Sequence, residues 1–110
     1  MEGGMAYYRK RSELIGALAN PYRLKMVDML EQGELCVCEF NTALDLDYST
    51  ISRHLSVLRK AGIAGYRKSG KQVYYHLRVP CVLNFLKCFD EVLRLNVEED
   101  AQHLEKRNGA

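Results

Sequence analysis

Residues 33–62, GELCVCEFNTALDLDYSTISRHLSVLRKAG, restrict the fold of this chain more than any other stretch. They predict two short helices joined by a tight turn. The first, about Val37 to Leu44, is too short to be stable alone, so it has to pack against its neighbour. The second begins near Tyr48, where Asp45 or Asp47 can serve as the N-cap. Its apolar residues recur at the spacing of one buried helix face, namely Ile51, Leu55 and Leu58.

The opposite face of this second helix carries short polar side chains and cations near its N-terminal end. A helix-turn-helix directs such groups at base edges and phosphates when its second helix enters the DNA major groove. An amphipathic helix whose charged face is only solvated is the alternative. We interpret the pair as a DNA-binding helix-turn-helix and expect its contacts from Tyr48, Ser49, Thr50, Ser52, Arg53, His54, Ser56 and Lys60.

Charge is distributed unevenly along the chain, although the net charge of +2 is too small to indicate nucleic-acid binding. The stretch from Tyr48 to Pro80 contains seven Lys or Arg and no Asp or Glu. The preceding stretch, Glu31 to Asp47, contains five acids and no Lys or Arg. One contiguous third of the protein is therefore predicted to present a cationic surface suited to phosphates.

After Gly62 the apolar spacing changes from helical to alternating. Residues 63–67 and 72–77 predict two strands, joined at 68–71 by a turn that contains glycine. A hairpin directly after a recognition helix forms a wing, and its cations can contact the sugar-phosphate backbone or the minor groove. We therefore add Arg67, Lys68 and Lys71 to the predicted DNA contacts. A hairpin whose charged tip is merely solvated is the alternative.

Three further helices are predicted, at 6–18, from Pro21 to Glu31, and from Pro80 to Leu95. Asn20 suits the N-cap and Pro21 the first helical position of the second of these. The last helix is apolar around so much of its circumference that one side should meet the core and the other a second copy. The predicted dimer interface comprises Leu14, Leu18, Val82, Phe85, Leu86, Phe89 and Val92.

These elements predict one winged helix-turn-helix domain over residues 1–110, mainly α with a β-hairpin wing, in the order α-α-α-α-β-β-α and homodimeric. The core spans about 6–96, and 97–110 is a polar tail expected to be frayed or irregular. No apolar run approaches the ~20 residues that cross a bilayer, and the N-terminus lacks a signal-peptide core. We expect a cytoplasmic protein without membrane contact, with its cysteines as thiols, metal ligands or redox sensors rather than structural disulfides.

Four segments, ALANPYRLKMVDML, GELCVCEF, STISRHLSVLRKAGI and GKQVYYHL, stand in order within about residues 12–95. In these segments the chain resembles the ArsR/SmtB (arsenical-repressor) winged helix-turn-helix metalloregulators. The resemblance implies a homodimer that represses its double-stranded operator DNA until a soft metal or metalloid ion binds. A small thiol enzyme is the weaker alternative, because the chain has no Cys-x-x-Cys, phosphate loop or clustered acid-base set.

Cys36 and Cys38 are the predicted ion ligands. Thiolates at a helix N-terminus suit soft ions. Residues two apart in a regular helix point about 200° apart, so both sulfurs reach one ion only if Cys36 lies outside the helix or the first turn unwinds. Ion binding would then distort the helix that supports the recognition helix. Two buried cysteines acting only as hydrophobes are the alternative.

The inducer stays open between several thiophilic signals. Arsenite or antimonite is the leading expectation, although arsenic-sensing relatives often carry a third cysteine where this chain has Asn41. Cadmium or lead is an alternative, but residues 1–35 contain no cysteine. Redox or persulfide sensing by linked cysteines is another. Cys81 and Cys88 are possible additional ligands, or dimer-core residues, about 10 Å apart along the last helix.

Overall fold

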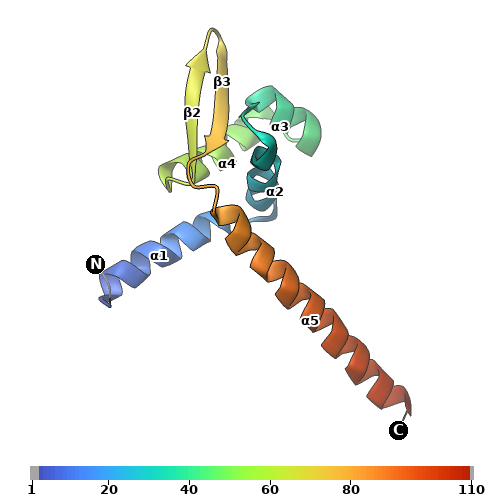
Figure 1. Ribbon diagram of the computed structural model, residues 1–110. Coiled ribbons are helices and arrows are strands. Elements are labelled where there is room, and N and C mark those ends of the chain that lie inside the picture. Colours follow the sequence, from blue (N-terminus) through green and yellow to red (C-terminus); the bar gives the residue numbers. More distant parts are fainter. Residues whose placement is uncertain (1–2, 110) are drawn as a thin grey trace. The chain divides into compact units, whose positions relative to one another are not determined.

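The computed structural model describes the backbone of residues 3–109 and the side chains of residues 3–106 (Figure 1). The described residues divide into two compact units, one within Met1–Val79 and one within Pro80–Ala110. The first unit contains α1 (Met5–Leu18), α2 (Pro21–Met29), the 3-10 turn η1 (Leu30–Gln32), β1 (Leu35–Cys36), α3 (Val37–Leu44), α4 (Tyr48–Lys60), β2 (Ala64–Ser69) and β3 (Gln72–Leu77). The second contains α5 (Val82–Gly109). This order confirms the predicted winged helix-turn-helix, with β1 as an addition.

The core of the first unit lies between α2, α3 and α4. Its largest fully buried side chains are Phe40, Met26, Ile51, Leu55, Leu58 and Val27. Ile51, Leu55 and Leu58 of α4 form the predicted apolar face. The helix packs against the core through this face, and its opposite face is exposed. The short helix α3 contributes Phe40 and packs against α4, as its length required.

Local chemistry accounts for the helix starts in this unit. The side chain of Asn20 accepts hydrogen bonds from the backbone N–H of Tyr22 (2.9 Å) and Arg23 (3.1 Å), and Pro21 occupies the first turn. This confirms the predicted cap. The helix ends at Met29, however, and a 3-10 turn carries the chain to Gly33, whose φ of 138° favours glycine.

The turn between α3 and α4 works without a glycine. Asp45 adopts the left-handed conformation, with φ of 52°, which Asp tolerates better than most residues. The side-chain amide of Asn41 donates to the carbonyl of Leu46, and Asp47 caps α4 by accepting from the N–H of Thr50 at 2.8 Å. These contacts set the angle at which α4 leaves the turn.

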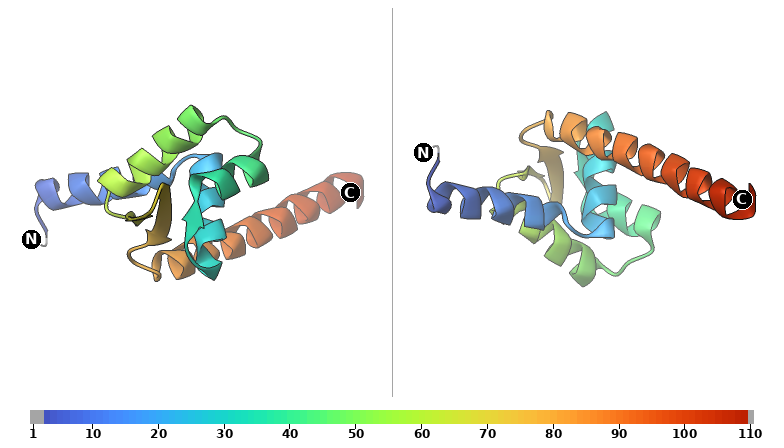
Figure 2. Two further views of the ribbon diagram at one scale, coloured as in Figure 1. Left: turned by 90° about the horizontal axis from the view of Figure 1, so that it is seen from above. Right: turned by 90° about the horizontal axis from the view of Figure 1, so that it is seen from below.

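The hairpin belongs to a three-stranded antiparallel sheet in the order β1-β3-β2. In Figure 1 the hairpin projects beyond the helices of its unit, and in Figure 2 it is seen nearly end-on with α4 along one side. The turn is shorter than predicted, because Ser69 already pairs with Gln72. Strand β1, which was not predicted, pairs Leu35 with Tyr75 and Cys36 with Tyr74.

The prediction of a frayed or irregular tail was wrong, because α5 continues to Gly109. Residues 96–107 contain no proline or glycine, and Ala, Gln, Leu, Glu and Lys favour helix. Arg94 pairs with Glu91 and Glu98, one turn away on either side, which supports the helix across the boundary we had placed at Leu95. Within residues 3–109, none of the helices has the length and hydropathy to span a membrane.

Candidate nucleic-acid interface and thiol site

The exposed face of α4 is the centre of the candidate nucleic-acid interface. Because Ile51, Leu55 and Leu58 face the core, Ser49, Arg53, Ser56 and Lys60 lie on the opposite side of the helix. Tyr48, Ser49, Ser52, Arg53 and Lys60 are exposed, whereas Thr50, His54 and Ser56 are partly buried. The first two turns therefore present hydroxyls and one cation, Arg53, on the exposed surface.

Asp47 fixes the start of this face. Hydrogen bonds from Thr50, followed by one from Ser49, lower the pKa of the Asp47 carboxyl below its usual value. The Oγ atom of Ser49 donates to Asp47 Oδ1 at 3.1 Å. The carboxylate therefore stays ionised at neutral pH and keeps capping the helix, with Ser49 held beside it.

His54 faces α2 rather than open solvent. Its ring stacks on Tyr22 with 5.9 Å between centroids, and its Nδ1 lies 3.3 Å from Nη1 of Arg23. Arginine can only donate, so Nδ1 is the acceptor of this bond. Partial burial, followed by the positive charges of Arg23 and Arg53, lowers the pKa of His54. Arg23 Nε also donates to the carbonyl of Ala17, at 2.6 Å, which links α4 through α2 to the end of α1.

The wing cations lie in two settings. Lys68 and Lys71 are exposed near the tip of the hairpin. Arg67 lies lower on β2, where its Nε donates to Glu34 Oε2 at 2.7 Å and its guanidinium stacks on Tyr74. On the same hairpin, the rings of Tyr66 and Tyr75 lie 6.0 Å apart, measured between centroids.

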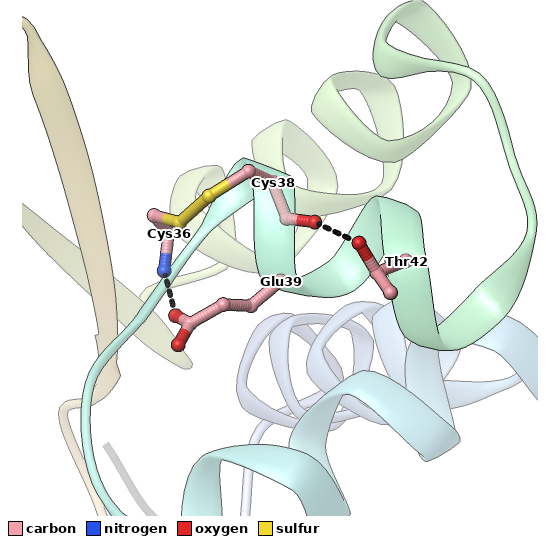
Figure 3. The surroundings of a disulfide bond; sticks show 4 residues. All are labelled: Cys36, Cys38, Glu39 and Thr42. Carbon is pink, nitrogen blue, oxygen red and sulfur yellow. Dashed lines mark hydrogen bonds between the residues drawn. A yellow bond between two sulfur atoms is a disulfide. The ribbon is translucent and has the colours of Figure 1, made fainter.

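Cys36 and Cys38 are joined by a disulfide in this structure, although the sequence led us to expect thiols (Figure 3). The geometric condition set by the sequence is met, because Cys36 is extended, with φ of −86° and ψ of 165°, and stands outside the helix as the N-cap of α3. Cys38 is the second residue of α3. The Glu39 carboxylate accepts from the Cys36 N–H at 2.8 Å, closing the first turn. The two sulfurs therefore reach one point without unwinding of α3.

A third protein ligand does not join this pair within residues 3–109. No group of three or more His, Cys, Asp or Glu side chains there is arranged to hold a metal ion. Asn41 stands where the resemblance placed a third cysteine in arsenic-sensing relatives, and its side-chain amide instead donates to the carbonyl of Leu46 in the turn before α4. Cys81 and Cys88 are free and exposed, in the other compact unit. In reduced form, the chemistry of the site is that of two adjacent soft thiolates.

The predicted dimer residues are mostly apolar side chains exposed in a single chain. In α5, Phe85 and Phe89 form an edge-to-face pair with centroids 5.3 Å apart and remain 44% and 49% exposed. Val92 of the same helix and Leu14 of α1 are also exposed. Val82 and Leu86 are partly buried, and Leu18 is buried already in the single chain.

Residues 20–66, from the cap of α2 to the start of the wing, match the family model described as "Bacterial regulatory protein, arsR family". The chain is also 43% identical over 88 residues to the arsenical resistance operon repressor of Escherichia coli, covering 79% of this chain and 75% of the relative. The chain belongs to the ArsR family. It is a winged helix-turn-helix regulator of transcription, as the resemblance implied.

The chain is also similar to a cadmium resistance regulator and to a solved structure. A cadmium resistance regulatory protein homologue of Staphylococcus aureus is 42% identical over 67 residues, or 60% of this chain and 55% of that protein. A Mycobacterium bovis domain, described as homodimeric and from a possible ArsR-family regulator, superimposes with a TM-score of 0.75 at 28% identity. That alignment covers 90% of this chain and 95% of the domain.

Three residues that contact the predicted DNA-binding side chains were not identified from the sequence. Arg23 and Tyr22 hold His54, and Glu34 pairs with Arg67. Each contact joins residues about 30 positions apart, so neither helical nor strand spacing points to it. The sequence offered one weak signal, the opposite charges of Glu34 near Cys36 and Arg67 in the wing.

Proposed function

We propose that this ArsR-family protein is a homodimeric repressor that leaves its operator when a thiophilic ion, arsenite first, binds Cys36 and Cys38. The observation that carries the proposal is the meeting of the two sulfurs at the junction of β1 and α3. The names of the arsenical and cadmium resistance relatives support an ion of this class. We expect the protein to act in the cytoplasm, where it would meet its operator DNA.

Arsenite fits a reduced pair chemically. Each As–S bond replaces one As–OH bond, and the thiol proton leaves with the hydroxide as water. Two such steps use both cysteines and leave one arsenic position for solvent or an outside thiol, since Asn41 offers no sulfur. Antimonite reacts in the same way. Cadmium and lead also prefer thiolates but require more ligands than this pair supplies.

Release follows from the position of the pair between two DNA-contacting parts. Helix α3 packs on α4, and β1 pairs with the wing strand β3. A bound ion holds the two sulfurs in a geometry set by its own bonds, so β1 and the first turn of α3 adjust. If DNA favours the ion-free arrangement, the two ligands oppose each other by linkage, typically 5- to 150-fold in affinity.

The test measures DNA affinity with and without the ion. Reduced protein is titrated against a fluorescent duplex selected from a random library, with and without saturating arsenite. Cys36→Ser and Cys38→Ser should bind DNA like wild type and lose release. Cys81→Ser and Cys88→Ser, the matched controls, should be released normally. Release that survives the first two changes but is lost with the second two would place the sensor at Cys81 and Cys88, around the start of α5, and contradict the proposal.

Asn41→Cys is a gain-of-function variant for the same site. It would supply a third sulfur three residues after Cys38 and should tighten arsenite binding. It also removes the hydrogen bond from Asn41 to Leu46, so its ion-free DNA affinity should fall. Asn41→Ser separates the two effects, since it removes the bond without adding a sulfur.

The Cys36–Cys38 disulfide favours a second candidate function, thiol redox sensing. Two thiols and one peroxide give the disulfide and two waters, with two electrons passing to the peroxide. The disulfide-bonded protein keeps α3, α4 and the wing strands formed. Operator release by peroxide, reversed by dithiothreitol and absent with arsenite, would favour this candidate over the ion sensor.

A further inference from the structure

Cys36, Tyr74 and Arg67 form one row across the three-stranded sheet. Cys36 of β1 pairs with Tyr74 of β3, and Tyr74 pairs on its other side with Arg67 of β2. Residues opposite each other in a ladder project from the same face, so their side chains are neighbours. The guanidinium of Arg67 lies 4.9 Å from the centroid of the Tyr74 ring. The ring of Tyr74 therefore lies between Cys36, the proposed ion ligand, and Arg67, the wing cation.

Glu34 makes a second connection between the same two segments. Its carboxylate accepts from Arg67 Nε at 2.7 Å, and it stands two residues before Cys36. Displacement of β1 would therefore move the carboxylate that orients the guanidinium. Arginine has five N–H donors, so Arg67 can hold Glu34 through Nε and still offer other donors to a phosphate.

We infer that Glu34 is a positioning residue that transmits ion binding at Cys36 to Arg67 in the wing. The inference rests on the proposed function and adds a route through the sheet to the one through α3. Ion-bound Cys36 shifts β1, and Glu34 turns Arg67 away from the position in which it contacts the DNA backbone. Both side chains of the pair are partly exposed, 37% for Glu34 and 55% for Arg67. An exposed ion pair of this kind changes an equilibrium by at most about fivefold.

Glu34→Gln tests the inference, because it keeps the shape of the side chain and removes its charge. The quantity measured is the release factor, the ratio of operator dissociation constants with and without saturating arsenite, in reduced protein. We expect Glu34→Gln to lower the release factor by about twofold to fivefold. Arsenite affinity, followed by the thiolate charge-transfer absorbance, should stay within about twofold of wild type. A release factor equal to that of wild type would overturn the inference.

Two comparisons show whether Glu34 acts through Arg67. In an Arg67→Gln background, Glu34→Gln should cause no further change in the release factor, whereas an independent effect there would contradict the link. Glu98→Gln removes the same charge from an ion pair on α5 and should leave the release factor unchanged. An equal loss in both glutamine variants would assign the effect to net charge. Glu34→Asp, which keeps the carboxylate, should restore part of the release.

Failure of the proposed function is distinguishable from failure of this inference. Wild type that arsenite does not release contradicts the proposed function, and release without dependence on Glu34 contradicts only the inference. Nitrogen-15 NMR of the Arg67 Nε–H group in DNA-free protein gives a readout that does not depend on release. Arsenite should shift this signal in wild type and shift it much less in Glu34→Gln, and equal shifts in both would overturn the link.

Discussion

His54 shows how one side chain can connect the recognition helix to the helix behind it. The imidazole accepts from Arg23 and stacks on Tyr22, both on α2. Only the neutral imidazole can accept at Nδ1, so the contact depends on protonation. We had predicted His54 as a DNA contact, and that remains a prediction, now for its other ring nitrogen.

We predict that His54 makes folding less stable in mild acid. Its pKa is lowered in the folded state, so between that value and the ordinary 6.5 the unfolded chain binds more protons. The contribution is fully present above pH 6.5, is lost as pH falls through the folded-state pKa, and does not change further below it. Urea unfolding from pH 8 to pH 5 should show a smaller pH-dependent loss in His54→Gln than in wild type.

The control for this residue is His103→Gln, on the exposed part of α5. It should keep the pH dependence of wild type. Arg23 and Arg53 are the charged groups that repel a proton on His54, so Arg23→Gln should weaken the dependence. An identical pH profile in wild type and His54→Gln would show that the histidine contact does not contribute.

At the scale of elements, we expect α4 and the wing to contribute to DNA binding in different ways. The outer face of α4 carries short polar groups of the kind that contact base edges, whereas the hairpin tip carries exposed lysines. Base contacts set sequence preference, and phosphate contacts set affinity and its salt dependence. The two elements should therefore respond to mutation in different ways.

We predict that Arg53→Ala costs about 1–3 kcal/mol of binding to the selected operator and relaxes its sequence preference. Neutralising Lys68 and Lys71 together should weaken all duplexes similarly. It should also reduce the slope of log affinity against log salt by about two per protomer. Anisotropy titrations on operator and scrambled duplexes across salt concentrations measure both effects. Unchanged operator affinity of Arg53→Ala would contradict the assignment of α4 as the recognition helix.

At the scale of the whole molecule, the exposed apolar side chains of α1 and α5 need a partner surface. A single chain leaves Phe85, Phe89 and Val92 about half exposed on one long helix. A surface of this kind is typical of an interface between copies, and two recognition helices would match two half-sites in an operator.

We predict that the protein is a dimer at micromolar concentration and that Phe89→Asp converts it largely to monomer. A charge on that ring position would have to be buried unpaired in the interface. Operator affinity should fall with it, because paired half-sites require paired helices. Sedimentation velocity measures the association, and Asn84→Asp, at an exposed polar position of the same helix outside the predicted interface, is the charge-matched control. A monomeric wild type that still binds a full operator tightly would contradict the dimer.

Much of this fold could be predicted because its signals are local. Asn20 and Asp47 cap their helices with atoms two or three residues away, and Ile51, Leu55 and Leu58 define a face by spacing alone. These signals depend on backbone geometry within one or two turns, so they are readable before any folding. The cysteine pair could be identified in the same way, since its position at a helix start follows from its neighbours.

The remaining features depended on the tertiary structure. Strand β1 is only two residues long and exists because β3 lies beside it, and no periodicity can appear in two residues. Glu34 and Arg67 are 33 positions apart and meet only when the sheet forms. The pairing of β1 with β3 holds Cys36 outside helix α3, so that its sulfur meets that of Cys38. From the local pattern alone, this position of Cys36 was one of two alternatives. Contacts between distant segments follow from how the buried faces pack, and that information is not contained in any single window of the sequence.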